Sequence, residues 1–288
     1  DGDRHGQGTS YNRCGRLIYD GEWSNNKFNG QGKYYFDDGV LRYEGKFKDD
    51  KFHGRGKAYY ENGDLKIECE FKNGKYDGQG IAYYENGKLR YDGEYKNGKR
   101  CGYGKEYDEK GELIYEGIWS DRNRHGQGKE YENGILKSEG EWANGSFIQG
   151  KSYNNGILRS ERNLNRMKEY DEKGELTFEG EIKNNKRNGQ GSIYYKGKVI
   201  KKGTFIDDKF SGIGVSILTD NDLDNDSRSG SNCEYKICEY GIFENDVLVD
   251  GWTLMILDEY IWSKINKNRT LEDCYVSHKY ISIFEFIA

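Results

Sequence analysis

Residues 19–47 read YDGEWSNNKFNGQGKYYFDDGVLRYEGKF, which is one complete repeat followed by the beginning of the next. The glycine pair GxG and the motif YxGxW, or a close variant of it, return every 24 residues between Gly6 and Trp119. In a chain that repeats one short unit, each unit packs mainly on its neighbours. Such an array usually presents a surface, so we expect a binding surface rather than a catalytic pocket.

The motif LxYxGxW alternates in side-chain character with a period of two. Residues 17–23 place Leu, Tyr, Gly and Trp on one face, and successive repeats place mainly Asp and Glu between them. This alternation predicts a half-buried strand with an aromatic face and an acidic outer face. Polar turns such as residues 96–99 (KNGK) and pairs such as Asn86-Gly87 supply the positive φ angles of hairpin turns. The prediction is an all-β, elongated antiparallel β-hairpin solenoid with a C-terminal capping segment.

A tyrosine stands three residues after GxG in nearly every unit, and a lysine often precedes it by two positions. The candidate partner-binding residues are Tyr59, Tyr83, Tyr107, Lys33, Lys57, Lys105 and Lys129. Strict alternation would place these tyrosines opposite the glycines, so we predict a bulge at GxG that resets the register and buries them. In the alternative, the register is unbroken and the tyrosines and lysines form an exposed binding stripe. The next position changes from Phe36 to Tyr60 to Asp108, so we expect it to be exposed.

Composition limits the classes of function. Basic and acidic residues number 45 and 50 and are well mixed, which argues against nucleic acid as the main partner. No apolar run approaches the roughly 20 residues that cross a bilayer. The 25 Tyr, 12 Phe and 5 Trp predict a core of stacked rings on a thin scaffold. Because the glycine of YxGxW shares the face of the rings, we expect rings to cover the bare Cα atoms of residues such as Gly93.

The repeat phase loosens after Leu136 and the unit is degenerate around 160–172. We predict a repeat array of about nine units over 1–215, an acidic polar loop over 216–234, and a degenerate last unit with a cap over 235–288. The alternating aspartates of 220–226 resemble a calcium-binding loop but lack its sixth-position Gly and twelfth-position Glu, so a solvated loop is the preferred interpretation. The chain begins at Asp1 within a repeat and without Met, so we expect it to be part of a longer protein.

The sequence shows no catalytic constellation. His5, His53 and His125 share one repeat phase, and hairpins that rise about 10 Å each would hold the first two about 20 Å apart. Zinc ligands lie at about 2 Å, so these histidines cannot share a metal ion. We expect no enzyme activity, cofactor or metal within these residues, although an enzyme domain could precede them. The six cysteines are expected to be reduced, with a Cys233–Cys238 disulfide as the alternative.

These residues resemble the MORN repeat, whose pattern is YxGxW, a Gly/Asn-Lys turn, GxG and a Tyr. The resemblance covers about residues 1–215 and, by its repetition, is highly specific. It implies a β-hairpin array that binds protein or, less strongly, phospholipid. Similar arrays occur in cytoskeletal and radial-spoke proteins, in junctophilins, beside lipid kinase and methyltransferase domains, and in antitoxin-like proteins.

We therefore expect a non-catalytic scaffold in the cytoplasm, with a cytoskeletal or ciliary assembly as one setting. Its partners would be proteins, and a second copy of the chain is a further candidate. The alternatives are a phospholipid-binding module, or an accessory repeat domain of an enzyme or antitoxin-like protein outside this sequence. The well-ordered units between Tyr19 and Gly128 present straight rows of side chains, so we expect the main partner to bind there.

Overall fold

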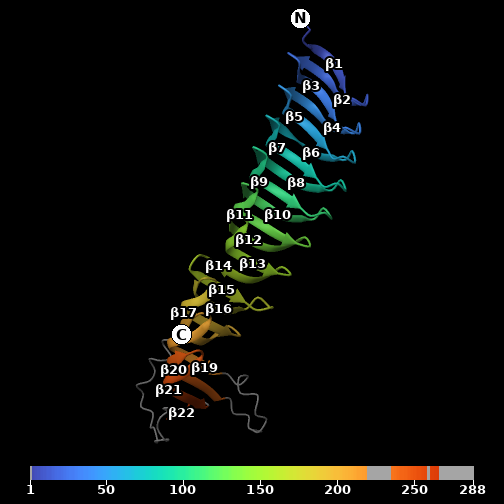
Figure 1. Cartoon of the computed structure of the whole chain (residues 1–288). Helices are drawn as coiled ribbons and strands as arrows, with labels where there is room; N and C mark the ends of the chain where they lie inside the picture. The colour runs from blue at the N-terminus through green and yellow to red at the C-terminus, as the bar shows by residue number, and fades with distance from the viewer. Residues whose placement is uncertain (1, 219–234, 258–259, 266–288) are drawn as a thin grey trace. The chain divides into compact units, whose positions relative to one another are not determined.

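The computed structural model describes residues 2–218, 235–257 and 260–265, and its regular elements are all β-strands (Figure 1). The chain divides into two compact units, residues 1–150 and 151–288. The strands of unit 1 are β1 (Gly6–Tyr11), β2 (Leu17–Ser24), β3 (Lys27–Tyr35), β4 (Leu41–Lys48), β5 (Lys51–Tyr59), β6 (Leu65–Lys72), β7 (Lys75–Tyr83), β8 (Leu89–Lys96), β9 (Lys99–Tyr107), β10 (Leu113–Ser120), β11 (Asn123–Glu132) and β12 (Ile135–Ala143). Strand β13 (Ser146–Asn154) contains the division between the units.

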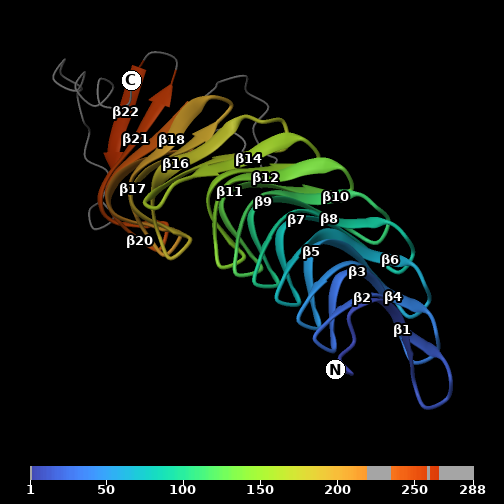
Figure 2. The same ribbon diagram turned by 90° about the horizontal axis from the view of Figure 1, so that it is seen from above.

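Unit 1 is a sheet of consecutive antiparallel hairpins, as predicted. From β1 to β12 each strand pairs with the next, and the glycines lie opposite one another, as in Gly21 opposite Gly32 and Gly32 opposite Gly45. Tyr19, Gly21 and Trp23 are buried, whereas Asp20 between them is exposed. The strands bend strongly, so each hairpin curves around one face of the sheet (Figure 2). We call this the inner face, and the opposite one the outer face.

The predicted bulge lies at the first glycine of GxG. Opposite β2, Gly32 pairs with Gly21 but Phe28 pairs with Trp23, so three residues of β3 face one of β2. Gly30, inside the bulge, has a φ of 59°, which L-residues rarely adopt. The backbone N–H of Gln31 donates to the Glu22 carboxylate at 2.9 Å. The acidic residue of YxGxW therefore satisfies a donor that the bulge releases from the strand ladder.

The core of unit 1 is built from a tyrosine that covers two glycines, as expected. A Cβ atom on Gly32 would lie 2.5 Å from the Tyr19 hydroxyl oxygen, and one on Gly21 would lie 2.7 Å from it. The Tyr19 hydroxyl donates to the carbonyl of Glu22 at 2.8 Å. Tyr43, Tyr91 and Tyr115 repeat this bond, at 3.0, 3.4 and 3.3 Å, to the equivalent carbonyls of Lys46, Glu94 and Ile118.

One hairpin, β6–β7, replaces this arrangement with a different pair. Ile67 stands where the tyrosine is expected and Cys69 where the glycine is expected. The Cys69 thiol donates to the carbonyl of Glu70 at 3.2 Å, which is the position that the tyrosine hydroxyl serves elsewhere. Burial raises the pKa of Cys69 to about 12. The two substitutions compensate, because the shorter Ile67 leaves room for the Cys69 side chain.

Unit 2 has a phenylalanine core. Its strands are β14 (Ile157–Arg162), β15 (Arg166–Tyr170), β16 (Leu176–Lys183), β17 (Lys186–Tyr195), β18 (Lys198–Ile206), β19 (Lys209–Leu218), β20 (Tyr235–Glu244), β21 (Val247–Leu257) and β22 (Tyr260–Ile265). Phe178, Phe205, Phe210 and Phe243 are fully buried or nearly so. The glycine column continues through Gly214, Gly241 and Gly251, which lie opposite one another in turn.

Most of the predicted loop and part of the predicted cap fall on residues that the structure does not describe. Residues 216–218 belong to β19, and 219–234 lie outside the described part, as do the calcium-like aspartates and Cys233. Of the predicted cap, residues 235–257 and 260–265 form β20, β21 and β22. The degenerate stretch around 160–172 forms the short, paired strands β14 and β15.

Candidate partner-binding groove

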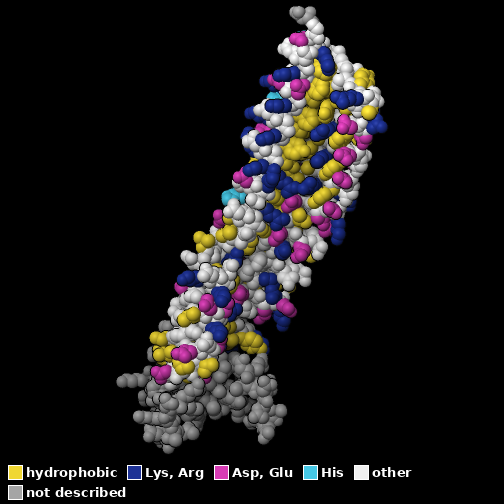
Figure 3. Space-filling view, viewed as in Figure 1, with side chains coloured by type: hydrophobic (Ala, Val, Ile, Leu, Met, Phe, Trp, Pro, Cys, Tyr) yellow, Lys and Arg dark blue, Asp and Glu magenta, His cyan; other side chains and the backbone are white. Residues whose placement is uncertain are grey.

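The inner face of unit 1 carries two adjoining hollows, of about 610 and 350 Å³, over strands β4–β9. We refer to them together as the groove. Figure 3 shows hydrophobic side chains gathered in a strip along this part of the surface, with Lys and Arg on its flanks. Phe52, Ala58 and Tyr76 belong to its lining, and each packs against the buried core.

The floor of the groove is formed by Phe52 and Tyr76, which belong to a column of aromatic residues at the second position of strands β3, β5 and β7. Phe28 stacks on Tyr19, with ring centroids 3.8 Å apart, and Phe52 stacks on Tyr43 at the same distance. Tyr76 continues the column beside Tyr95, at 5.6 Å. All three column residues are only partly buried, so part of each ring is covered by the core while the remainder stays accessible.

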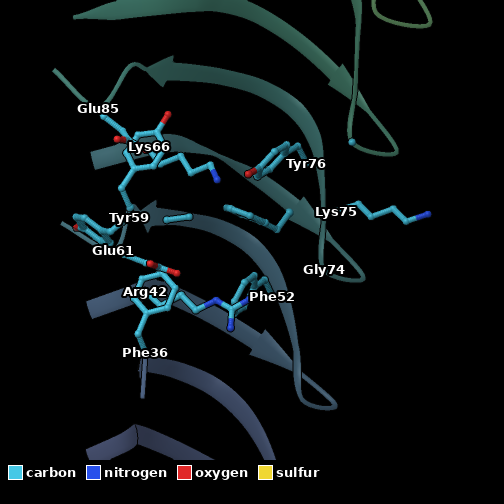
Figure 4. A pocket seen from close by; sticks show the side chains of 14 residues that line it. Phe36, Arg42, Phe52, Tyr59, Glu61, Lys66, Gly74, Lys75, Tyr76 and Glu85 are labelled. Atoms are coloured by element: carbon cyan, nitrogen blue, oxygen red, sulfur yellow. The ribbon is translucent and has the colours of Figure 1, made fainter. Parts of the chain in front are cut away.

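One wall of the groove carries a cationic column at the same 24-residue spacing. The Arg42 guanidinium lies 5.3 Å from the Phe36 ring, the Lys66 amine 5.0 Å from Tyr60, and the Arg90 guanidinium 5.5 Å from Tyr84. In Figure 4, Arg42 and Lys66 extend across the hollow in the direction of Phe52 and Tyr76. All three cations are exposed.

The aromatic residues under this column were expected to be exposed, and that expectation was wrong. Phe36, Tyr60 and Tyr84 are half-buried. The Tyr60 hydroxyl donates to the carbonyl of Tyr83, and the Tyr84 hydroxyl to that of Tyr107, both at 2.8 Å. Each ring is thereby held between its own hairpin and the next.

The groove has a positive excess in a chain of net charge −5. Its cationic lining residues are Arg42, Lys66, Lys75, Arg90, Arg100 and Arg122. Its acidic ones are Glu61, Glu85 and Glu106. The salt bridges of unit 1's described residues do not include Arg42, Lys66 or Arg90. These three cations, which share one repeat phase, and the lining residues Lys75 and Arg122 are therefore available to an acidic ligand.

The apolar floor ends at β9, where arginine takes the place of the aromatic residue. The Arg100 guanidinium lies 4.4 Å from the Tyr91 ring and pairs with Glu106 at 2.6 Å. Arg124 repeats this over Tyr115 at 4.6 Å and pairs with Glu130 at 2.9 Å. Their charges are compensated within the protein, so the inner face from β9 onward offers fewer free cations.

Of the predicted residues, the tyrosines and lysines do not form one exposed stripe. Tyr59 and Tyr83 are half-buried and border the groove. The Tyr59 hydroxyl, however, donates to Glu44 at 2.6 Å, and Glu44 lines a shallow depression on the outer face. The bulge precedes the second glycine, so side chains alternate without interruption from Gly32 to Tyr34. Tyr34, the residue before the predicted tyrosine, therefore lies on the inner face. The expected reset onto the glycine face was therefore wrong.

The predicted lysines lie on the outer face among carboxylates. Lys57 is 3.9 Å from Glu68, and Lys105 is 3.6 Å from Glu116. Lys33 lies opposite Glu44, and Lys129 lies opposite Glu116. The outer face therefore has alternating charge rather than a basic stripe.

Sequence reasoning missed the groove's main residues, although a signal was present. Arg42, Lys66 and Arg90 follow the leucine of LxYxGxW, at the same phase in three successive units. Phe28, Phe52 and Tyr76 follow the lysine after the turn, also at one phase. Comparing each phase across repeats finds both columns, but only the curvature of the hairpins shows that they share a face.

The described residues contain no cluster of three or more His, Cys, Asp or Glu that could hold a metal ion. His5 and His125 are exposed and His53 is half-buried. No described helix is long and apolar enough to span a membrane.

Comparison with protein families identifies the chain. The MORN repeat matches residues 19–40, 43–65, 91–112, 115–135, 178–197 and 202–223, and the MORN repeat variant matches residues 76–97. The chain belongs to the MORN-repeat family. Repeats of this family are commonly modules that bind proteins or membranes, and are generally non-catalytic. Comparison with curated protein sequences gives no match.

Proposed function

We propose that this protein is a non-catalytic scaffold whose groove in unit 1 binds a segment of a protein partner. The observation that carries the proposal is the combination of a partly open aromatic floor with Arg42, Lys66 and Arg90, which have no carboxylate partner among the described residues. Contiguous exposed aromatic surface with nearby arginine is typical of protein interfaces. A cytoskeletal or ciliary setting in the cytoplasm is part of the proposal and rests on the likeness of the repeat to arrays in such assemblies.

A membrane surface is the second candidate, since Lys and Arg attract anionic lipid by about 1 kcal/mol each near the surface. Two observations favour a protein. The lysines that a flat bilayer could reach, such as Lys57 and Lys105, lie on the outer face beside Glu68 and Glu116. Arg42, Lys66 and Arg90 line a hollow on the inner face, which a flat bilayer cannot enter.

The test is a selection of peptides from a random displayed library on the whole chain. Selected peptides should lose at least 10-fold in affinity on the variant Arg42→Gln/Lys66→Gln/Arg90→Gln. The matched control, Lys57→Gln/Lys105→Gln/Lys129→Gln, removes the same charge from the outer face and should retain binding. If selected peptides bind both variants as they bind the parent chain, the groove is not the binding site.

Co-sedimentation with vesicles, with and without anionic lipid, tests the second candidate. We expect the chain to remain in the supernatant in both cases. Sedimentation that requires anionic lipid and is lost in the outer-face variant would favour a membrane-surface module.

A further inference from the structure

The groove offers a ligand no backbone hydrogen bonds. Strands β4–β9 are each paired on both sides, and the groove runs across them rather than along an edge. A bound segment cannot add itself as a further strand there. It must satisfy its own backbone, either internally as an α-helix or with water as a polyproline II helix in an open groove.

The spacing of the cations distinguishes these two conformations. Arg42, Lys66 and Arg90 are one hairpin apart, and two strands at about 4.8 Å each give about 9.6 Å per step. Three residues of polyproline II rise about 9.3 Å and return to the same face. Seven residues of an α-helix rise about 10.5 Å. Over the two steps the helix is out of register by about 2 Å and polyproline II by about 0.6 Å.

On the basis of the proposed function, we propose that the groove binds an acidic, proline-containing segment in the polyproline II conformation, with a carboxylate at every third residue. The pattern is Glu-Pro-x, repeated at least three times. Each carboxylate meets one of Arg42, Lys66 and Arg90, and two of the proline rings pack on the floor at Phe52 and Tyr76. Aromatic grooves are a frequent receptor for this conformation, and proline has no N–H to leave unpaired on burial.

The groove also sets where the segment stops. Beyond Tyr83 the floor position is taken by Arg100, whose charge Glu106 compensates. A fourth carboxylate at this end would meet Ile114, which stands 24 residues after Arg90 where the column would need a cation. Three triplets therefore fill the site, and longer peptides should gain little affinity.

The test is fluorescence anisotropy of labelled synthetic peptides with the whole chain. The probe has four Glu-Pro-Ala triplets. One control has the same composition in blocks without a three-residue period, and another is a helical peptide of equal charge with glutamates seven residues apart. We expect the triplet peptide to bind at least 10-fold more tightly than either control, and to lose at least 10-fold with Arg42→Gln/Lys66→Gln/Arg90→Gln.

The outcomes separate this inference from the proposed function. Equal binding of the triplet and block peptides would overturn the spacing. Tighter binding of the helical peptide, abolished by the same groove variant, would overturn the conformation and leave the groove as the binding site. If the triplet peptide binds but the Lys57→Gln/Lys105→Gln/Lys129→Gln variant abolishes it, the location is wrong. Circular dichroism of both variants must first match that of the parent chain.

Discussion

The first three hairpins of unit 1, residues 17–83, and the next two, residues 89–132, fill the same position with different chemistry. In the first region an aromatic ring lies above the core, with Phe52 stacked at 3.8 Å on Tyr43. In the second, Arg100 lies 4.4 Å above Tyr91 and is neutralised by Glu106. The repeat thus needs a flat group above its tyrosine but not an apolar one. This freedom lets one scaffold carry an open apolar floor in one region and an ion-pair network above the core in the next.

The buried tyrosines are common to both regions, and their ionisation should have the largest effect. Burial, the largest cause, raises the pKa of Tyr19 in the first region and of Tyr115 in the second to about 12. A raised folded-state pKa means that the stabilisation is complete below about pH 10 and is lost as pH rises toward 12. Raising one tyrosine pKa from 10 to about 12 corresponds to about 2.7 kcal/mol of stabilisation of the folded state. We expect strand circular dichroism to be lost as the tyrosinate absorbance rises between pH 10 and 12. Complete ionisation of the tyrosines with the sheet intact would contradict this.

Moving a side chain from the first region to the second should have the next largest effect. Gly93→Cys would place a Cβ atom 2.5 Å from the Cα of Gly104 and 2.7 Å from the Tyr91 hydroxyl oxygen. We expect a loss of about 3 kcal/mol in the free energy of unfolding, measured by chemical denaturation.

The matched control is Tyr91→Ile/Gly93→Cys, which copies the natural Ile67 and Cys69 pair. We expect the double variant to recover at least half of the loss, because removing the phenol makes room for the thiol. A double variant as unstable as Gly93→Cys would show that the tyrosine ring is not what excludes a side chain there.

Converting the second region into the first tests the ion-pair network. Glu106→Ala removes the partner of Arg100, and we expect a loss of about 1–2 kcal/mol. Arg100→Phe/Glu106→Ala copies Phe52 and Ala58, and should return stability to within about 1 kcal/mol of the parent, since apolar replacement of an ion pair is often neutral. Chemical denaturation of Arg100→Phe, of Glu106→Ala and of the double variant gives the free energy of interaction between the two residues. If their effects are additive, Arg100 and Glu106 do not act as a pair.

The outer face should not distinguish the two regions. The Tyr131 hydroxyl donates to Glu116 at 2.8 Å, as Tyr59 does to Glu44. The Tyr131 hydrogen bond, followed by Lys105, holds the pKa of Glu116 below its usual range. This stabilisation is present above the usual glutamate pKa and is lost as pH falls through the lower folded-state value.

We expect Tyr131→Phe and Tyr59→Phe each to cost about 1 kcal/mol near neutral pH. The Tyr131→Phe cost should shrink in acid, once Glu116 is protonated. Denaturation at neutral and acid pH checks both values. A cost for Tyr131→Phe that does not change with pH would contradict the assignment of Glu116.

Much of the fold could be predicted from the sequence because its signals are local and repeated. The alternation in LxYxGxW identifies the strands, and the Asn-Gly and Asp-Gly pairs identify the turns. The bulge at GxG also followed from counting positions. The face of the sheet on which Tyr59 lies could not be predicted by counting positions. That face depends on which glycine the bulge precedes, and Gly30 and Gly32 are indistinguishable in sequence.

The sequence by itself determined that this protein is an array of β-hairpins with an aromatic core, because each hairpin depends on residues within one 24-residue period. Only the tertiary structure decided that Arg42, Lys66 and Arg90 share a groove with Phe52 and Tyr76. That arrangement depends on the bend of the strands and on contacts between successive hairpins. The tertiary structure also decided that Ile67 and Cys69 compensate for one another, because this depends on the space above Gly80.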